Sequence, residues 1–93
     1  MQSYNAQQLR GRKRKIALVG MNGGCCSRCG YSSNYAALEF HHAAPTDKTF
    51  NLDLRSLSNR AWDVIVAEAE KCELVCSNCH KEIHNPESLM QRM

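Results

Sequence analysis

In the first 20 residues, apolar positions recur among polar ones with the period of an α-helix. Leu9, Ile16 and Val19 recur at i, i+7 and i+10, which places their side chains on one face. This pattern predicts a helix over residues 3–20 whose buried face contains those three side chains. Gly11 lies inside the pattern, and a glycine there weakens the prediction of an unbroken helix.

A second helical pattern follows Ser58, whose hydroxyl suits the N-cap of a helix over about residues 59–71. Its apolar positions recur at i, i+3, i+4 and i+7: Trp62, Ile65, Val66 and Ala69. This spacing predicts one stripe that is buried against the rest of the fold. The preceding segment, residues 43–57, reads as a polar loop with three apolar anchors: Phe50, Leu52 and Leu54.

Two short segments favour β-strands. They are residues 36–42, which end before Pro45, and residues 73–75. A third helix is expected to begin within residues 76–79 and to end near Pro86. Short strands mixed with helices predict an α+β fold.

The chain has 93 residues, enough for one domain, and a net charge of +3. Residues 1–15 contain five of the 12 basic side chains and none of the nine acidic ones. On a helix these bases form a face that suits contact with phosphate groups, and an ordinary solvated face is the alternative. The five bases are Arg10, Arg12, Lys13, Arg14 and Lys15.

Several classes of protein do not fit the sequence. No run of about 18 apolar residues is present, so we expect no transmembrane helix and no membrane partner. The first 15 residues hold a basic segment without an apolar region or a cleavage site, so they do not read as a signal peptide. We therefore expect a cytoplasmic protein whose cysteines stay reduced and are available to a metal.

Four of the six cysteines form two Cys-x2-Cys pairs, Cys26 with Cys29 and Cys76 with Cys79. A two-residue spacer lets both sulfurs of a tight turn face one ion, and two such turns complete a closed tetrahedral zinc site. Cys25 offers an alternative pair with Cys29, but the shared spacing of the two pairs favours Cys26.

The four histidines fall in two places, His41-His42 and His80-x3-His84. Residues at i and i+4 share a helix face, so His80 and His84 can chelate one ion. Neighbours on a strand point to opposite sides. One residue of the His41-His42 pair is therefore expected to ligate the metal while the other faces the substrate.

These motifs together resemble the small, zinc-containing HNH endonucleases of the ββα-metal fold, in their stand-alone phage and bacterial form. The resemblance runs from about Gly23 to Asn85 and rests on the order of the motifs. They are Cys-x2-Cys, Leu-Glu-Phe-His-His-x2-Pro and Cys-x2-Cys-His-x3-His. The His-His and His-x3-His pairs are also similar to those of colicin-type nuclease domains.

The resemblance implies a role for each histidine. His42 corresponds to the general base that deprotonates the attacking water. His41, His80 and His84 correspond to ligands of a catalytic divalent metal. The middle asparagine of the family, which braces the loop carrying the base, is expected near Lys71, where no asparagine stands.

The chemistry of the ligands adds to this picture. Three neutral imidazoles suit Mn²⁺, Ni²⁺, Co²⁺ or Zn²⁺ better than Mg²⁺, which prefers oxygen ligands. Glu39 lies two residues before His41, on the same strand face, and is a candidate to orient that imidazole. The products implied by the resemblance carry a 5′-phosphate and a 3′-hydroxyl.

The sequence thus predicts a small ββα-metal, treble-clef-like nuclease core held by a four-cysteine zinc site. This core would span residues 23–86, after a basic N-terminal helix in residues 1–22 and before a tail in residues 87–93. The expected partner is DNA, bound mainly through its backbone, and a homodimer or a larger phage or host complex stays open. A non-catalytic zinc module that binds nucleic acid is the alternative.

Overall fold

The computed structural model describes residues 6–86. The first residues of the expected N-terminal arm and the expected tail, residues 87–93, lie outside this part. The fold is α+β, as predicted, and has one two-stranded antiparallel sheet. Strand β1 (Leu38–His42) pairs with β2 (Cys72–Cys76).

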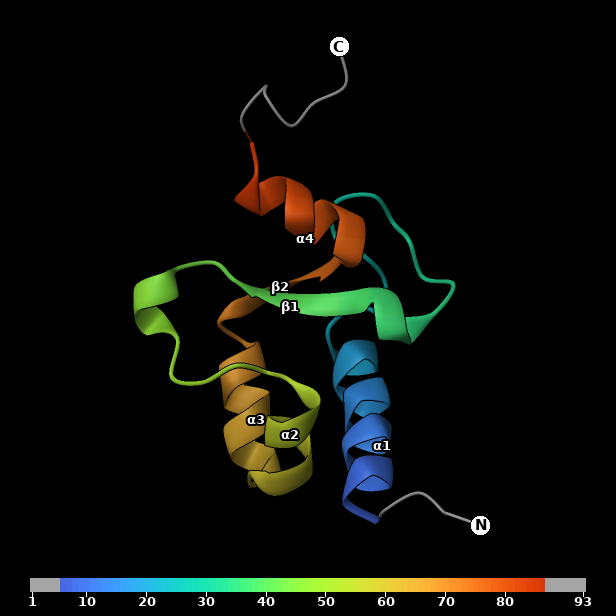
Figure 1. The fold of residues 1–93 in the computed structure, drawn as a ribbon, viewed down its shortest axis with the longest axis vertical. Helices are drawn as coiled ribbons and strands as arrows, with labels where there is room; N and C mark the ends of the chain where they lie inside the picture. The colour runs from blue at the N-terminus through green and yellow to red at the C-terminus, as the bar shows by residue number, and fades with distance from the viewer. Residues whose placement is uncertain (1–5, 87–93) are drawn as a thin grey trace.

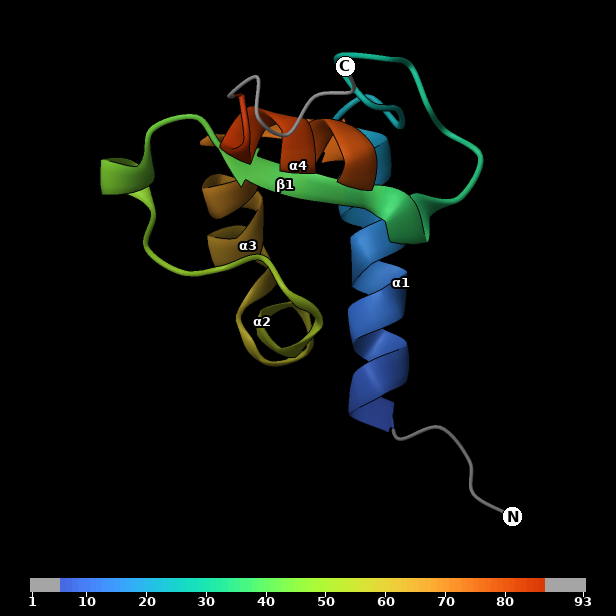
Figure 2. The same ribbon diagram turned by 45° about the horizontal axis from the view of Figure 1, so that its top comes forward.

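The sheet separates two layers of helices (Figures 1 and 2). Helix α4 (Ser77–His84) follows β2 directly and lies on one side of the sheet. The other side carries α1 (Ala6–Met21), α2 (Leu54–Asn59) and α3 (Trp62–Ala69). Side chains that alternate along β1 therefore point toward different layers.

The core consists of two small clusters of buried side chains. One lies between α1, the first cysteine turn and the sheet, and the other lies between α1, α2 and α3. Helix α1 contributes Val19 to the first cluster and Leu18 to the second. Phe40 of β1 packs against both clusters, so the sheet joins them.

The buried face of α1 differs from the predicted one. Val19 is buried as expected, but Leu9 and Ile16 are exposed, and Gly11 and Leu18 take their place. The reason is α2, which packs against α1 where Gly11 has no side chain. The helix continues through this glycine without a break.

The helix expected over residues 59–71 is shorter and forms α3, and a separate helix, α2, begins within the expected polar loop of residues 43–57. The prediction of Ser58 as an N-cap is wrong, because Ser58 is buried within α2 and its Oγ donates a hydrogen bond to Leu54 O. Asp53 caps α2 instead, accepting a hydrogen bond from Ser56 N. The apolar stripe of α3 is confirmed, with Ile65 fully buried in the second cluster.

The predicted start of the first strand is also displaced. Residues Tyr35–Ala37 form a 3₁₀ turn, capped by the Asn34 side chain, which accepts a hydrogen bond from Ala36 N. Strand β1 therefore begins at Leu38.

Two arginines of α1 bind the end of α2. Arg10 Nε donates to Ser58 O at 2.9 Å, and Arg14 donates to Leu57 O and to Arg60 O. Carbonyls at a helix C-terminus lack partners within the helix and attract cations. These two arginines therefore help to fix α2 on α1.

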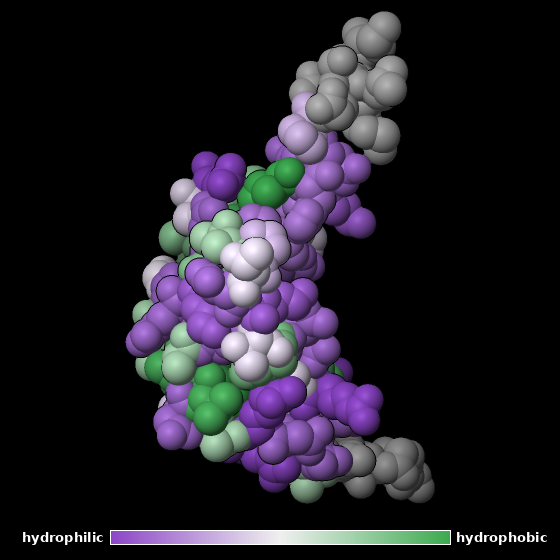
Figure 3. Space-filling model, turned by 90° about the vertical axis from the view of Figure 1, so that its left-hand side faces the viewer, coloured by the Kyte–Doolittle hydropathy of each residue, from purple (hydrophilic) through white to green (hydrophobic). Residues whose placement is uncertain are grey.

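One face of the described part is largely polar. Figure 3 shows that the side at the left of Figure 1 carries mostly hydrophilic residues, with hydrophobic residues in small separate groups. Within residues 6–86 we find no helix of the length and apolar character needed to span a membrane.

We expect Gly11→Ala to destabilise the protein. A Cβ at this position would collide with Ser58 Oγ and lie 2.8 Å from Leu54 Cδ1. Overpacking of this kind costs about 1–3 kcal/mol, which exceeds the gain of about 1 kcal/mol that alanine brings to a helix. Urea denaturation of the metal-loaded protein measures the change.

Gly20→Ala is the matched control in the same helix. A Cβ at Gly20 meets nothing within 4 Å, so this variant should be at least as stable as the wild type. Equal stability of the two alanine variants would contradict the close packing of α1 on α2.

Candidate metal centre and histidine cluster

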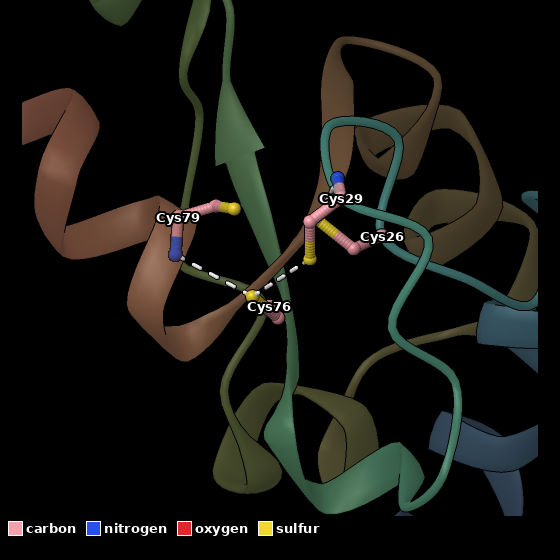
Figure 4. A group of neighbouring side chains, drawn as sticks. All are labelled: Cys26, Cys29, Cys76 and Cys79. Carbon is pink, nitrogen blue, oxygen red and sulfur yellow. Dashed lines mark hydrogen bonds between the residues drawn. The ribbon is translucent and has the colours of Figure 1, made fainter.

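Four sulfurs meet beside the junction of β2 and α4 (Figure 4). Cys26 and Cys29 come from the turn after α1, Cys76 ends β2, and Cys79 lies in the first turn of α4. We call these four residues the cysteine cluster. Their Sγ atoms all lie within 4.8 Å of one another, and those of Cys29 and Cys76 are 3.6 Å apart.

The local backbone aims these sulfurs inward. Arg28 N and Cys29 N both donate to Cys26 Sγ at 3.4 Å, and Cys79 N donates to Cys76 Sγ at 3.4 Å. Gly30 closes the first turn with a φ of 82°, a left-handed conformation that glycine adopts without strain. The Cys76 sulfur is at the same time the N-cap of α4.

The cluster favours a bound cation. Burial raises the pKa of Cys26, but backbone N–H groups, including that of Cys29, outweigh burial and lower this pKa to about 6. Hydrogen bonding to the Cys76 thiol, together with burial, raises the pKa of Cys79. A divalent ion removes this competition for protons, and four thiolates can hold a metal such as zinc.

The two remaining cysteines lie outside the cluster, as the spacing predicted. Cys25 is half-buried next to Cys26 and does not join the group. Cys72 Sγ donates to Glu68 O at 3.6 Å, and burial raises the pKa of this thiol to about 11.

Three histidines meet on the α4 side of the sheet. His41 of β1 approaches His80 and His84 of α4, with ring centroids 4.9–5.3 Å apart. One ring nitrogen from each lies within 4.8 Å of the other two. We call these three residues the histidine cluster, and their arrangement suits one transition-metal ion.

Glu39 orients a different imidazole from the expected one. Its Oε1 accepts a hydrogen bond from His80 Nδ1 at 2.6 Å, and its Oε2 accepts one from Ser77 Oγ. The reason is that α4 lies over this strand face and brings His80 within reach. Donation from Nδ1 leaves Nε2 of His80 as the metal-binding atom.

Electrostatics favour the neutral, metal-binding form of His41. Burial, followed by the charges of His80 and His84, lowers the pKa of His41. Burial raises the pKa of Glu39, but the hydrogen bonds from His80 and Ser77 outweigh it and lower this pKa. The carboxylate is therefore ionised beside the cluster.

His42 points away from the histidine cluster toward α3. Its Nε2 lies 2.8 Å from Oε2 of Glu68, a buried carboxylate that sequence reasoning did not single out. The two residues are 26 positions apart, so no local pattern could have paired them.

One cavity of about 1090 Å³ extends past both the histidine cluster and His42. All four histidines line it, together with three basic side chains, namely Arg12, Lys15 and Lys48. The predicted basic face is therefore divided. Lys13 lines a second, smaller groove beside Trp62, while Arg10 and Arg14 bind α2.

Comparison of the chain with protein-family models, with curated proteins and with solved structures found no match. The proposed function therefore rests on the geometry of the two clusters and of the cavity.

Loss of a cluster cysteine should unfold the protein. A four-thiolate zinc site contributes about 10–16 kcal/mol at neutral pH, more than two small core clusters can replace. Cys26→Ser and Cys79→Ser should lose zinc and their folded circular dichroism spectrum. Metal content by mass spectrometry, measured beside the spectrum, checks this.

Cys25→Ser and Cys72→Ser are the matched controls, and both should keep one zinc per chain. If Cys25→Ser lost the zinc and Cys26→Ser kept it, the first pair of ligands would be Cys25 and Cys29.

Proposed function

We propose that this protein is a metal-dependent DNA endonuclease of the HNH type, which hydrolyses phosphodiester bonds. The observation that carries this proposal is that the histidine cluster and His42 line the same cavity, together with three basic side chains. Hydrolysis of a phosphodiester needs charge neutralisation, an activated water and a bound backbone. The cavity offers groups for all three.

The order of elements supports the assignment to the ββα-metal fold. An antiparallel pair of strands is followed at once by a helix that carries two histidines toward the first strand. Residues 23–86 would form this core and α1 would serve as the basic arm. Zinc in the cysteine cluster would hold the core together.

Lys71 stands near the position that the family gives to its middle asparagine. Its Nζ donates to Asp47 O at 2.9 Å and to Thr49 Oγ1 at 3.0 Å. Both acceptors belong to the loop after β1, the strand that ends in His42. Lys71 thus supplies a brace for the loop that carries the proposed base.

The histidine cluster would hold the catalytic divalent ion, with Mn²⁺, Ni²⁺, Co²⁺ or Zn²⁺ favoured over Mg²⁺ by three imidazole ligands. When bound, such an ion supplies Lewis-acid stabilisation of the phosphoryl and leaving oxygens. Glu39 would maintain the orientation of His80 for this purpose, through the 2.6 Å hydrogen bond.

His42 would act as the general base. It takes a proton from the attacking water as the water oxygen bonds to phosphorus, and the bond from phosphorus to the 3′ oxygen breaks. The leaving 3′ oxygen takes a proton from a solvent water and becomes a 3′-hydroxyl, and the phosphate stays on the 5′ side.

Arg12, Lys15 and Lys48 would bind the DNA backbone at the wall of the same cavity. Burial lowers the pKa of Lys15, against the opposing effect of Glu39. None of the described basic side chains forms a pattern that reads base edges, so we propose recognition through the backbone.

Substitution of the histidines should separate two phenotypes. His42→Ala should keep metal affinity while turnover falls by about 100- to 10,000-fold, the usual contribution of a general base. His80→Ala and His41→Ala should raise the metal concentration needed for cleavage, and His84→Ala, whose ligand is the most exposed, should do so more mildly. Calorimetry with Mn²⁺ and plasmid cleavage at saturating Mn²⁺ measure the two properties.

Glu82→Gln, an exposed change on α4 outside the cavity, is the control and should cut DNA like the wild type. Wild-type cleavage by all four histidine variants would refute the endonuclease proposal. If His42→Ala lost metal binding while His41→Ala kept it, His42 would be the metal ligand and His41 the general base.

DNA affinity should depend on the cavity-lining bases of α1. Combined Arg12→Gln and Lys15→Gln should weaken duplex binding and reduce the log–log salt slope by about 0.9 for each lost phosphate contact. Lys13→Gln, from the same basic run but outside the cavity, should leave the slope unchanged. Fluorescence anisotropy over a salt series measures this, and equal slopes for all variants would remove α1 from the DNA-binding surface.

A further inference from the structure

We propose that Glu68 is the positioning residue of His42, holding its imidazole in the Nε2–H tautomer so that Nδ1 is the proton-accepting atom. This inference rests on the proposed function, because it assigns how the general base is held. It concerns a buried carboxylate of α3 that belongs to neither of the two candidate metal clusters.

The contact between the two residues is shielded from solvent. The His42 side chain is 9% exposed and the Glu68 side chain 3% exposed, and Nε2 lies 2.8 Å from Oε2. A hydrogen bond in such low-dielectric surroundings is stronger than one in water, and it restricts the orientation of the ring. The last turn of α3 and the last residue of β1 thereby become joined.

Glu68 is equipped to stay ionised. Thr49 N donates to Oε2 and Lys71 Nζ donates to Oε1, both at 2.9 Å. Burial raises the pKa of Glu68, but the hydrogen bonds from Thr49, Lys71 and His42 outweigh it and lower the pKa to about 2.

An ionised carboxylate can only accept hydrogen bonds. The neutral ring of His42 must therefore carry its proton on Nε2, and its free electron pair is on Nδ1. When Nδ1 takes a proton from water, the positive charge of the ring develops beside the Glu68 carboxylate. The same pairing of carboxylate and imidazole orients the base in hydrolases of unrelated folds.

The same carboxylate also fixes the wall of the cavity. Thr49 and Asp47 lie in the loop after β1, and Lys71, which binds Glu68, holds this loop through both residues. Lys48, between them, lines the cavity. Glu68 therefore sets the position of His42 and of the adjoining wall together.

The direct test is the tautomer of His42 in the wild-type protein. Long-range ¹⁵N–¹H correlation spectra of the zinc-loaded, ¹⁵N-histidine-labelled protein in alkaline solution distinguish the two neutral forms. Comparison with His42→Ala assigns the signals. We expect the Nε2–H form, and the Nδ1–H form would overturn the proposal. This measurement requires no cleavage, so it holds even if the protein proves not to be a nuclease.

The second test is Glu68→Gln. One amide oxygen cannot serve three donors, so the ring should lose its single tautomer and turnover should fall by about 100-fold. Mn²⁺ affinity should stay unchanged, because the histidine cluster lies on the other side of the sheet. In a protein that already carries His42→Ala, Glu68→Gln should lower turnover no further, because Glu68 acts through His42. A merely structural role of Glu68 would lower turnover in that background too.

Glu70→Gln is the matched control, the same substitution at an exposed position two residues away, and should behave like the wild type. Wild-type turnover and tautomer in Glu68→Gln would overturn the positioning role while leaving the endonuclease proposal intact. Absence of cleavage by the wild type with every divalent ion would instead overturn the endonuclease proposal. Should Glu68→Gln not fold, the wild-type tautomer still decides the inference.

Discussion

The cysteine cluster is the constraint on which the rest of the arrangement depends. Its sulfurs connect the turn after α1 to the end of β2 and the start of α4, and these three segments also share one small group of buried side chains. Cys76 both ends the strand and caps the helix, and Cys79 directly precedes His80. When these sulfurs are held in place, the position of His80 on α4 is therefore set as well.

Strand β1 then divides the histidines between two environments. His41 faces α4, where two more imidazoles and a partly exposed carboxylate surround it. His42 faces α3, where it meets a single buried carboxylate. An imidazole among others is suited to share a metal, and an imidazole paired with a carboxylate is suited to move a proton. The alternation of a strand is thus enough to give two neighbouring histidines different surroundings.

Residue spacing was sufficient where the chemistry is local. The two Cys-x2-Cys turns, the pair His80 and His84, and the stripe of α3 could all be predicted, because each depends on positions a few residues apart. The division of residues 54–69 into two helices was missed, because Asp53 is a better cap than the buried Ser58. The partner of Glu39 was wrong for a related reason, since only the packing of α4 decides which imidazole lies within reach. Glu68 gave no signal, because two of its three hydrogen-bond partners, His42 and Thr49, lie 26 and 19 residues away along the chain.

Helix α1 shows why a run of basic residues does not have one meaning. Five bases within six positions must point around the whole helix, because successive residues turn by about 100°. Gly11 brings α2 against one face, so Arg10 and Arg14 next to that face bind the last carbonyls of α2. Arg12 and Lys15 project from another face into the cavity, and Lys13 lines the groove by Trp62. The basic side chains that bind α2 and those that line the cavity are therefore different residues, and the position of one glycine decides which are which.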